Sequence, residues 1–186
     1  MGTKMTSRKP QHEELWFRWK DVGIKTFCRV GSGTIQREIT ASQGYYPFME
    51  APKKVCLVRC PWSRLLSVWH GLWPGGTMPS RGYPPIQSLE ELIYYLHGLD
   101  DDEMEVHTKP MSAQLAGLWA PDDEELWDME AFFANPPHGI PKPAQRHHQS
   151  PNVPEPQVSQ TAQVMFFDRY VEDYKLWWRA MKKAPL

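Results

Sequence analysis

An arginine, a proline and a serine follow an apolar run near the middle of this chain, at Arg59, Pro61 and Ser67. Residues 55–58 are apolar and β-branched at both ends, which predicts a short buried strand. Pro61 suits the first turn of a helix, and residues 65–69 continue that helix with an apolar face. Arg59 would then lie where a strand ends and a helix begins, which is where open α/β sheets bind anions. We therefore expect Arg59, together with the Ser67 hydroxyl further along the helix, to bind an anionic group.

A second candidate anion site lies nearer the N-terminus. Residues 15–19 predict a first strand, residues 20–26 the turn after it, and residues 27–39 a helix that Gly31 and Gly33 weaken. A turn that contains lysine, glycine and threonine suits a phosphate, because backbone N–H groups approach the anion, the lysine neutralises it and the hydroxyl adds a directed bond. A solvated turn beside a strand is the alternative interpretation.

The first of these stretches resembles the 3′-phosphate-binding motif of the sulfotransferases that use 3′-phosphoadenosine 5′-phosphosulfate (PAPS). In that family an apolar strand is followed by Arg-x-Pro and by an Arg-Leu-x-Ser-like continuation that ends in an aromatic residue. The matching residues of this chain are, in order, Arg59, Pro61, Arg64, Leu65, Ser67 and Trp69. The resemblance implies that Arg59 and Ser67 bind the 3′-phosphate of the cofactor. An ordinary strand–turn–helix with a surface arginine is the alternative.

The second stretch resembles the 5′-phosphosulfate loop of the same family, which usually reads Lys-x-Gly/Ala-x-Thr/Ser-Ser/Thr. The chain departs from that form: Lys20 stands one residue early when Gly23 and Thr26 are aligned, and Lys25 takes a position where the family usually has a hydroxyl. The resemblance implies that Lys20 or Lys25 activates the sulfuryl group, with Gly23 and Thr26 completing the loop. Which of the two lysines does so stays open.

Two further segments match the carbohydrate sulfotransferase branch. Residues 170–176 look like its Tyr-x-x-Asp-Tyr-x-Leu/Phe ending, and they fall within residues 163–181, which predict one amphipathic closing helix. Residues 126–130 predict a strand that carries the branch's acidic residue. Residues 139–150 resemble its Pro-His-x-Asn-x-Ser loop, with Gln149 in place of the asparagine. The pieces follow the family's order, so the chain resembles a compact PAPS-dependent sulfotransferase.

The resemblance and the pattern of elements predict the same fold class. Two strand–loop–helix units with anion-binding features favour an α/β protein. The family implies a three-layer arrangement, with a central parallel sheet flanked by helices and a P-loop-like nucleotide-binding architecture. We expect a flexible N-terminus over residues 1–12 and one domain over residues 13–186, in which the Pro-rich residues 136–156 form a loop. Residues 89–99 predict an amphipathic scaffold helix, capped by Ser88 with Glu91 at the capping-box position.

Sulfuryl transfer needs charge stabilisation on the leaving group and a base for the acceptor proton. The leaving-group charge would fall to Lys20 or Lys25. His107 is the first candidate base, because the acidic run at residues 100–105 would raise its basicity and because residues 107–110 resemble a His-x-Arg/Lys-Pro segment of the family. A loop histidine beside a solvated acidic patch is the alternative. Glu38 is the second candidate, since related enzymes place an acidic base downstream of the 5′ loop.

Composition limits the partners of the chain. Its 186 residues carry a formal net charge of −1, which gives no general attraction to nucleic acid or to an anionic membrane. No apolar stretch approaches the roughly 20 residues that cross a bilayer, and the N-terminus lacks the pattern of a secretory signal. Cys28, Cys56 and Cys60 cannot all pair. We expect reduced thiols, a cytoplasmic location and no metal site.

The resemblance implies an acceptor hydroxyl on a carbohydrate or a small molecule. Nine tryptophans would suit stacking on sugar rings and would equally suit a small core. Two alternative functions remain: a non-catalytic nucleotide-binding or accessory protein on the same fold, and a small P-loop-type kinase. The absence of a complete Gly-x-x-x-x-Gly-Lys-Ser/Thr counts against the kinase. The acceptor and the oligomeric state do not follow from the sequence.

Overall fold

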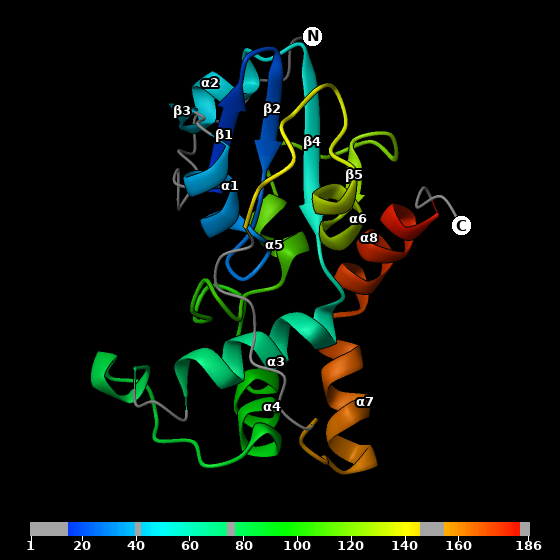
Figure 1. Ribbon diagram of the computed structural model, residues 1–186. Helices are drawn as coiled ribbons and strands as arrows, with labels where there is room; N and C mark the ends of the chain where they lie inside the picture. Colours follow the sequence, from blue (N-terminus) through cyan, green and yellow to red (C-terminus); the bar gives the residue numbers. More distant parts are fainter. Residues whose placement is uncertain (1–14, 40–41, 74–76, 146–154, 183–186) are drawn as a thin grey trace, which may run out of the picture.

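The computed structural model describes residues 15–39, 42–73, 77–145 and 155–182. Five strands form one mixed sheet in the order β3-β1-β2-β4-β5, with helices packed against it (Figure 1). The strands are β1 (Trp16–Trp19), β2 (Val22–Lys25), β3 (Ser42–Gln43), β4 (Lys53–Val58) and β5 (Leu126–Asp128). The α/β class is therefore confirmed. The sheet is parallel only across β2, β4 and β5, because β1 runs antiparallel to both β2 and β3.

The turn predicted over residues 20–26 is wrong for most of its length. A tight hairpin turn at Lys20 and Asp21 reverses the chain, with Lys20 at φ 50°, and residues 22–25 then form β2. This strand is buried along its whole length because β1 pairs with one of its edges and β4 with the other. Its four residues carry too weak a local pattern to be recognised without those partners.

Nine helical segments are described: α1 (Ser32–Glu38), α2 (Tyr45–Met49), α3 (Pro61–Leu72), η2 (Pro79–Arg81), α4 (Leu89–His97), α5 (Met111–Leu115), α6 (Met129–Ala134), α7 (Gln160–Arg169) and α8 (Val171–Met181). The strand over residues 55–58 and the helix from Pro61 are confirmed as β4 and α3. The helix predicted over residues 27–39 begins only at Ser32, because Gly31 adopts a left-handed conformation at φ 75°.

Three other boundaries differ from the prediction. The closing helix over residues 163–181 is two helices, divided at Tyr170, whose backbone leaves the helical region at φ −113° and ψ 19°. The strand over residues 126–130 ends at Asp128, whose carboxylate caps α6. Helix α4 has the predicted Ser88 cap, whose hydroxyl oxygen accepts from the Glu91 N–H at 3.1 Å. The Glu91 carboxylate accepts from the N–H of Gln87 at 2.8 Å, one residue before the capping-box position.

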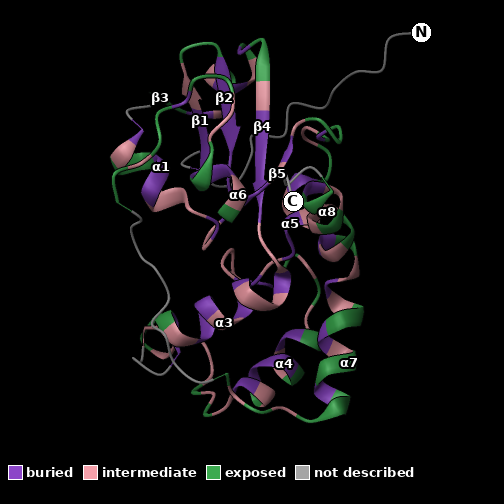
Figure 2. Ribbon diagram, turned by 45° about the vertical axis from the view of Figure 1, so that its right-hand side comes forward, coloured by how far each residue is buried: buried purple, intermediate pink, exposed green. Residues whose placement is uncertain are grey.

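Buried side chains form two clusters. One surrounds the sheet and includes residues of α1, α5, α6 and α8, and the other lies between α3, α4 and α7. Helices α3, α4 and α7 lie beyond the carboxyl ends of β2 and β4, and Figure 2 places their buried residues on the sides that face one another. Residues 136–145 contain no helix or strand, and the remainder of the predicted loop through 154, like residues 1–12, lies outside the described residues. In the part of the chain that is described, every helix is too short or too polar to span a bilayer.

Candidate functional site

The carboxyl ends of β2 and β4 bring two of the predicted anion-binding segments to one edge of the sheet. Lys25, the last residue of β2, is in register with Cys56 of β4, which continues for two more residues, to Val58. Thr26 therefore follows β2, and Arg59 follows β4, on the same side of the sheet. Arg59 is half-buried, and its Nη1 donates to the carbonyl oxygen of Arg29 at 3.1 Å. Ser67 lies further along α3 and is 3% exposed.

The segment between β2 and α1, residues 26–31, is held by arginine side chains from the neighbouring strand end and helix. Besides the bond from Arg59, Nε of the buried Arg64 donates to the carbonyl oxygen of Cys28 at 3.1 Å. The guanidinium of Arg29 packs over Gly71 of α3, where an added Cβ would lie 2.5 Å from Nη2. Arg29 itself has a left-handed backbone at φ 63°. Three guanidinium groups therefore gather at residues 26–31, which we call the arginine-held loop.

Lys25 and Thr26 are buried at the start of this loop. Lys25 is 2% exposed, and its Nζ lies 4.2 Å from the ring centroid of Trp16 and 4.7 Å from that of Phe27. Such cation–π contacts stabilise an ammonium group that has lost its water. The Thr26 hydroxyl is fully buried and has no hydrogen-bond partner among the described residues. An unsatisfied buried hydroxyl costs about 1–3 kcal/mol, which a ligand oxygen would offset.

The structure does not bring Lys20 or Gly23 to this edge. Lys20 is exposed in the β1–β2 turn with its Nζ over the Trp19 ring, whereas Arg59 follows the far end of β4. At roughly 3.3 Å per residue, the length of β4 separates the two by about 20 Å. Gly23 lies within β2 against α2, where a Cβ would come within 2.7 Å of the Phe48 ring. Its lack of a side chain therefore serves packing.

Glu38, the second candidate base, lies in the last turn of α1 and is half-buried. The helix begins at Ser32, directly after the arginine-held loop, and rises about 1.5 Å per residue. Glu38 is therefore about 9 Å from the helix start, measured along the axis. Glu38 thus lies at the opposite end of α1 from the arginine-held loop.

His107 lies beside the arginine-held loop. Its Nδ1 is 2.7 Å and 2.9 Å from the two carboxylate oxygens of Glu105, and the imidazole also forms a hydrogen bond with the Cys28 side chain. Burial disfavours the charged imidazole, but the bonds to Cys28 and Glu105 outweigh it and raise the pKa of His107 to about 9. Burial likewise acts against ionised Glu105, yet the contact with His107 lowers the pKa of that carboxyl. His107 is therefore a cation at neutral pH.

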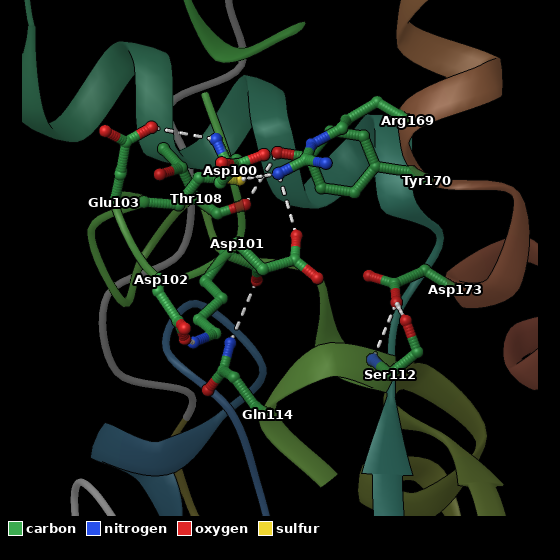
Figure 3. A network of polar contacts seen from close by, with 12 residues as sticks. Asp100, Asp101, Asp102, Glu103, Thr108, Ser112, Gln114, Arg169, Tyr170 and Asp173 are labelled. Atoms are coloured by element: carbon green, nitrogen blue, oxygen red, sulfur yellow. Dashed lines mark hydrogen bonds and ion pairs between the residues drawn. The ribbon is translucent and has the colours of Figure 1, made fainter. Parts of the chain in front are cut away.

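The segment that carries His107 is fastened by residues of the predicted Tyr-x-x-Asp-Tyr motif (Figure 3). The hydroxyl of Tyr170 donates to the carbonyl oxygen of Thr108 at 2.6 Å. The fully buried carboxylate of Asp173 accepts from the N–H of Met111 at 2.7 Å, and from the N–H and the hydroxyl of Ser112 at 2.8 Å each. Residues 108–112 are therefore tied to α8.

Two further side chains hold the same segment. Nη2 of Arg64 donates to the carbonyl oxygen of Val106 at 3.3 Å, and Nε2 of Gln114 donates to the same oxygen at 3.2 Å and to that of Lys109 at 2.9 Å. Arg64 thus links the arginine-held loop to the His107 segment. The sequence motifs contain Arg64 and Asp173, but no role was predicted for either. Glu105 belongs to the acidic run that was expected to raise the basicity of His107, and it does raise the pKa of that residue. Cys28 was not predicted as part of the site. The signal for Asp173 was a carboxylate on the apolar side of an amphipathic helix.

The remaining predicted polar residues have structural roles or lie outside the description. Asp128 accepts from the N–H groups of Glu130 and Ala131 and from Nε1 of Trp177, so it joins β5, α6 and α8. Residues 146–150 of the predicted His-containing loop are outside the described residues. The described part of the chain contains no cluster of three or more His, Cys, Asp or Glu side chains that could hold a metal ion.

Comparisons with protein-family models, curated proteins and solved structures find no match for this chain. The functional assignment therefore depends on the site geometry and on the sequence motifs.

Proposed function

We propose that this protein is a sulfotransferase that moves a sulfuryl group from PAPS to a hydroxyl of a carbohydrate or small-molecule acceptor. One observation carries the proposal: Lys25 ends one parallel strand and Thr26 follows it, while Arg59 follows the neighbouring strand, so that these three residues lie at the carboxyl edge of the sheet. This edge is where open α/β proteins bind nucleotides. The proposal includes a three-layer, P-loop-like arrangement around that edge.

Arg59 and Ser67 would bind the 3′-phosphate, and Lys25 and Thr26 the 5′-phosphosulfate. The unpartnered Thr26 hydroxyl supports this assignment, because a phosphate or sulfate oxygen would supply its missing partner. In the transfer, negative charge develops on the oxygen between phosphorus and sulfur, and a lysine ammonium in a site shielded from water stabilises it strongly. Lys25 rather than Lys20 has the required position. Entry of the nucleotide would have to draw the Lys25 ammonium from the rings of Trp16 and Phe27.

His107 takes a different part from the one expected for a simple base. With a pKa of about 9 it carries a proton at neutral pH, and its hydrogen bonds go to Glu105 and Cys28. It would therefore act on the sulfuryl oxygens through its positive charge. It would accept the acceptor's proton only in the minor neutral form. Glu38 remains the alternative base.

The test is thermal unfolding of the full chain with and without 3′-phosphoadenosine 5′-phosphate (PAP). At about 100 times Kd, binding stabilises by about 2.7 kcal/mol, which shifts Tm by roughly 5–10 °C in a chain of this size. Arg59→Ala should abolish the shift, each variant being compared with its own unliganded Tm. The matched control is Arg37→Ala, which removes an exposed arginine of α1. No shift of the unmodified protein at millimolar PAP would end the proposal.

The burial of Lys25 favours a second candidate, a nucleotide-binding protein that does not turn over. An ammonium held between two aromatic rings is not presented to a sulfuryl group unless the rings yield. This alternative predicts the same PAP-induced shift in Tm. Incubation with PAPS and a panel of sugar and phenolic acceptors separates the two, because only the enzyme releases PAP.

A further inference from the structure

Cys28 lies at the centre of a thiol–imidazole–carboxylate arrangement. Its side chain is hydrogen-bonded to the imidazole of His107, and Nδ1 of that imidazole is bound by both carboxylate oxygens of Glu105. A nucleophile within hydrogen-bond reach of a histidine, which a third group orients, is the structural signature of an activated nucleophile. Nothing in the proposed sulfuryl transfer uses the thiol.

Positively charged side chains lie around Cys28. The imidazole beside it is cationic at neutral pH, and the guanidinium of Arg29 interacts electrostatically with both Cys28 and Glu105. Cationic neighbours and partial exposure mark reactive cysteines. Cys28 is a free, half-buried thiol.

The other two cysteines, both within the described residues, serve as internal references. Cys56 is fully buried in β4, and burial raises its pKa to about 12. Cys60 is half-buried, like Cys28, but it precedes α3 and has Tyr174 as its titratable neighbour. Cys60 therefore matches Cys28 in exposure without the imidazole.

We propose that Cys28 is a nucleophilic thiol that undergoes thiol–disulfide exchange with small disulfides. The Cys28 sulfur attacks one sulfur of the disulfide R–S–S–R, a new S–S bond joins Cys28 to one R–S group, and the original S–S bond breaks. The leaving thiolate departs with the electron pair, and the proton of the Cys28 thiol passes to that thiolate or to water. The adduct would occupy the arginine-held loop.

That position gives the modification a consequence for nucleotide binding, which rests on the proposed function. Cys28 is two residues from Thr26, and its carbonyl is bound by Arg64 while that of Arg29 is bound by Arg59. A bulky adduct on Cys28 would displace these groups. The mixed disulfide should therefore lose the PAP-induced shift in Tm, and reduction should restore it.

The experiment follows the reaction of the folded, reduced protein at pH 7 with dithionitrobenzoate, a disulfide that releases a coloured thiolate. Peptide mass spectrometry locates the adduct. We expect the fastest phase to be absent in Cys28→Ser and retained in Cys60→Ser. His107→Gln should slow that phase by about tenfold, because the variant removes the imidazole that is hydrogen-bonded to the thiol. Equal rates at Cys28 and Cys60, or an unchanged rate in His107→Gln, would overturn the proposal.

Two controls separate chemistry from misfolding. Glu105→Gln keeps the imidazole and removes its carboxylate partner, so this variant should also slow the reaction. It replaces His107→Gln in the test if that variant proves unstable. In urea the unmodified chain and the His107→Gln and Glu105→Gln variants should react alike at Cys28, because the arrangement exists only in the folded chain. Fast labelling of Cys28 without PAP binding would support the reactive thiol and contradict the sulfotransferase proposal. PAP binding without fast labelling of Cys28 would support the sulfotransferase proposal and contradict the reactive thiol.

Discussion

The charge of His107 is set by the two side chains that it contacts. Burial alone would favour the neutral ring, yet Glu105 accepts from Nδ1 and Cys28 forms a second bond, so that the pKa is about 9. Because this value lies above the ordinary 6.5, the interaction stabilises the folded state fully below pH 6.5. The contribution is lost as the pH rises from 6.5 through 9.

This balance predicts a pH-dependent loss of stability. Between pH 6.5 and 9.5 the free energy of unfolding should fall by roughly 1–3 kcal/mol through His107. His107→Gln should flatten this part of the profile, and so should Glu105→Gln. Urea unfolding at several pH values measures it. The other charged or titratable groups that interact with the pair, Cys28, Arg29, Arg81 and Tyr83, are left intact. A profile that falls equally in His107→Gln would contradict the assigned pKa.

Lys25 and Lys20 provide a matched pair for the proposed reaction. Lys25→Met keeps an unbranched side chain between the rings of Trp16 and Phe27 while removing the charge. If Lys25 stabilises the leaving group, its removal should lower kcat by roughly 100- to 1,000-fold. Lys20→Met should leave kcat unchanged, because Lys20 lies at the opposite end of the parallel strands. Release of PAP from PAPS measures both, and the reverse order of effects would exclude Lys25.

At the level of elements, helix α8 acts on the site through the backbone of another segment. Asp173 accepts three hydrogen bonds from Met111 and Ser112, and Tyr170, at the junction of α7 and α8, holds the carbonyl of Thr108. A buried carboxylate can remain only where such donors compensate it. The break between α7 and α8 follows from the same contacts, because Tyr170 must turn inward while α8 packs against β5.

Asp173→Asn should therefore destabilise the protein by roughly 1–3 kcal/mol, because an amide nitrogen would face an N–H donor and leave it unsatisfied. Tyr170→Phe should cost less, about 1 kcal/mol, since it removes one bond. Asp168→Asn is the control, on the exposed surface of α7. Urea denaturation of the three variants gives the comparison. Equal stability of Asp173→Asn and Asp168→Asn would show that α8 does not hold the segment.

At the level of the whole molecule, the site lies where the two buried clusters meet. Helix α3 contributes Leu65, Val68 and Trp69 to the buried cluster between α3, α4 and α7. Its Arg64 donates hydrogen bonds to the arginine-held loop and to the His107 segment. Figure 1 shows α3 crossing beneath the carboxyl ends of β2 and β4. Any ligand at this edge would therefore touch groups held by both clusters.

The sequence by itself determined the elements whose signals are local. Residues 55–58 of strand β4 are a continuous apolar run, α3 starts at a proline, and α4 begins at a serine cap, so each could be recognised without knowing its neighbours. The motif around Arg59 and Ser67 was also visible in the sequence, because both residues belong to one continuous strand–helix unit.

Only the tertiary structure decided the rest. Strand β2 forms because β1 and β4 pair with it, and it places Lys20 and Lys25 at its opposite ends. The spacing of the motif alone did not decide which of these two lysines would act on the sulfuryl group. The contact between Cys28 and His107 joins residues far apart in the chain, and no local pattern encodes it. Propensity and periodicity act over a few residues, whereas strand pairing and the charge of a buried group depend on what the fold places beside them.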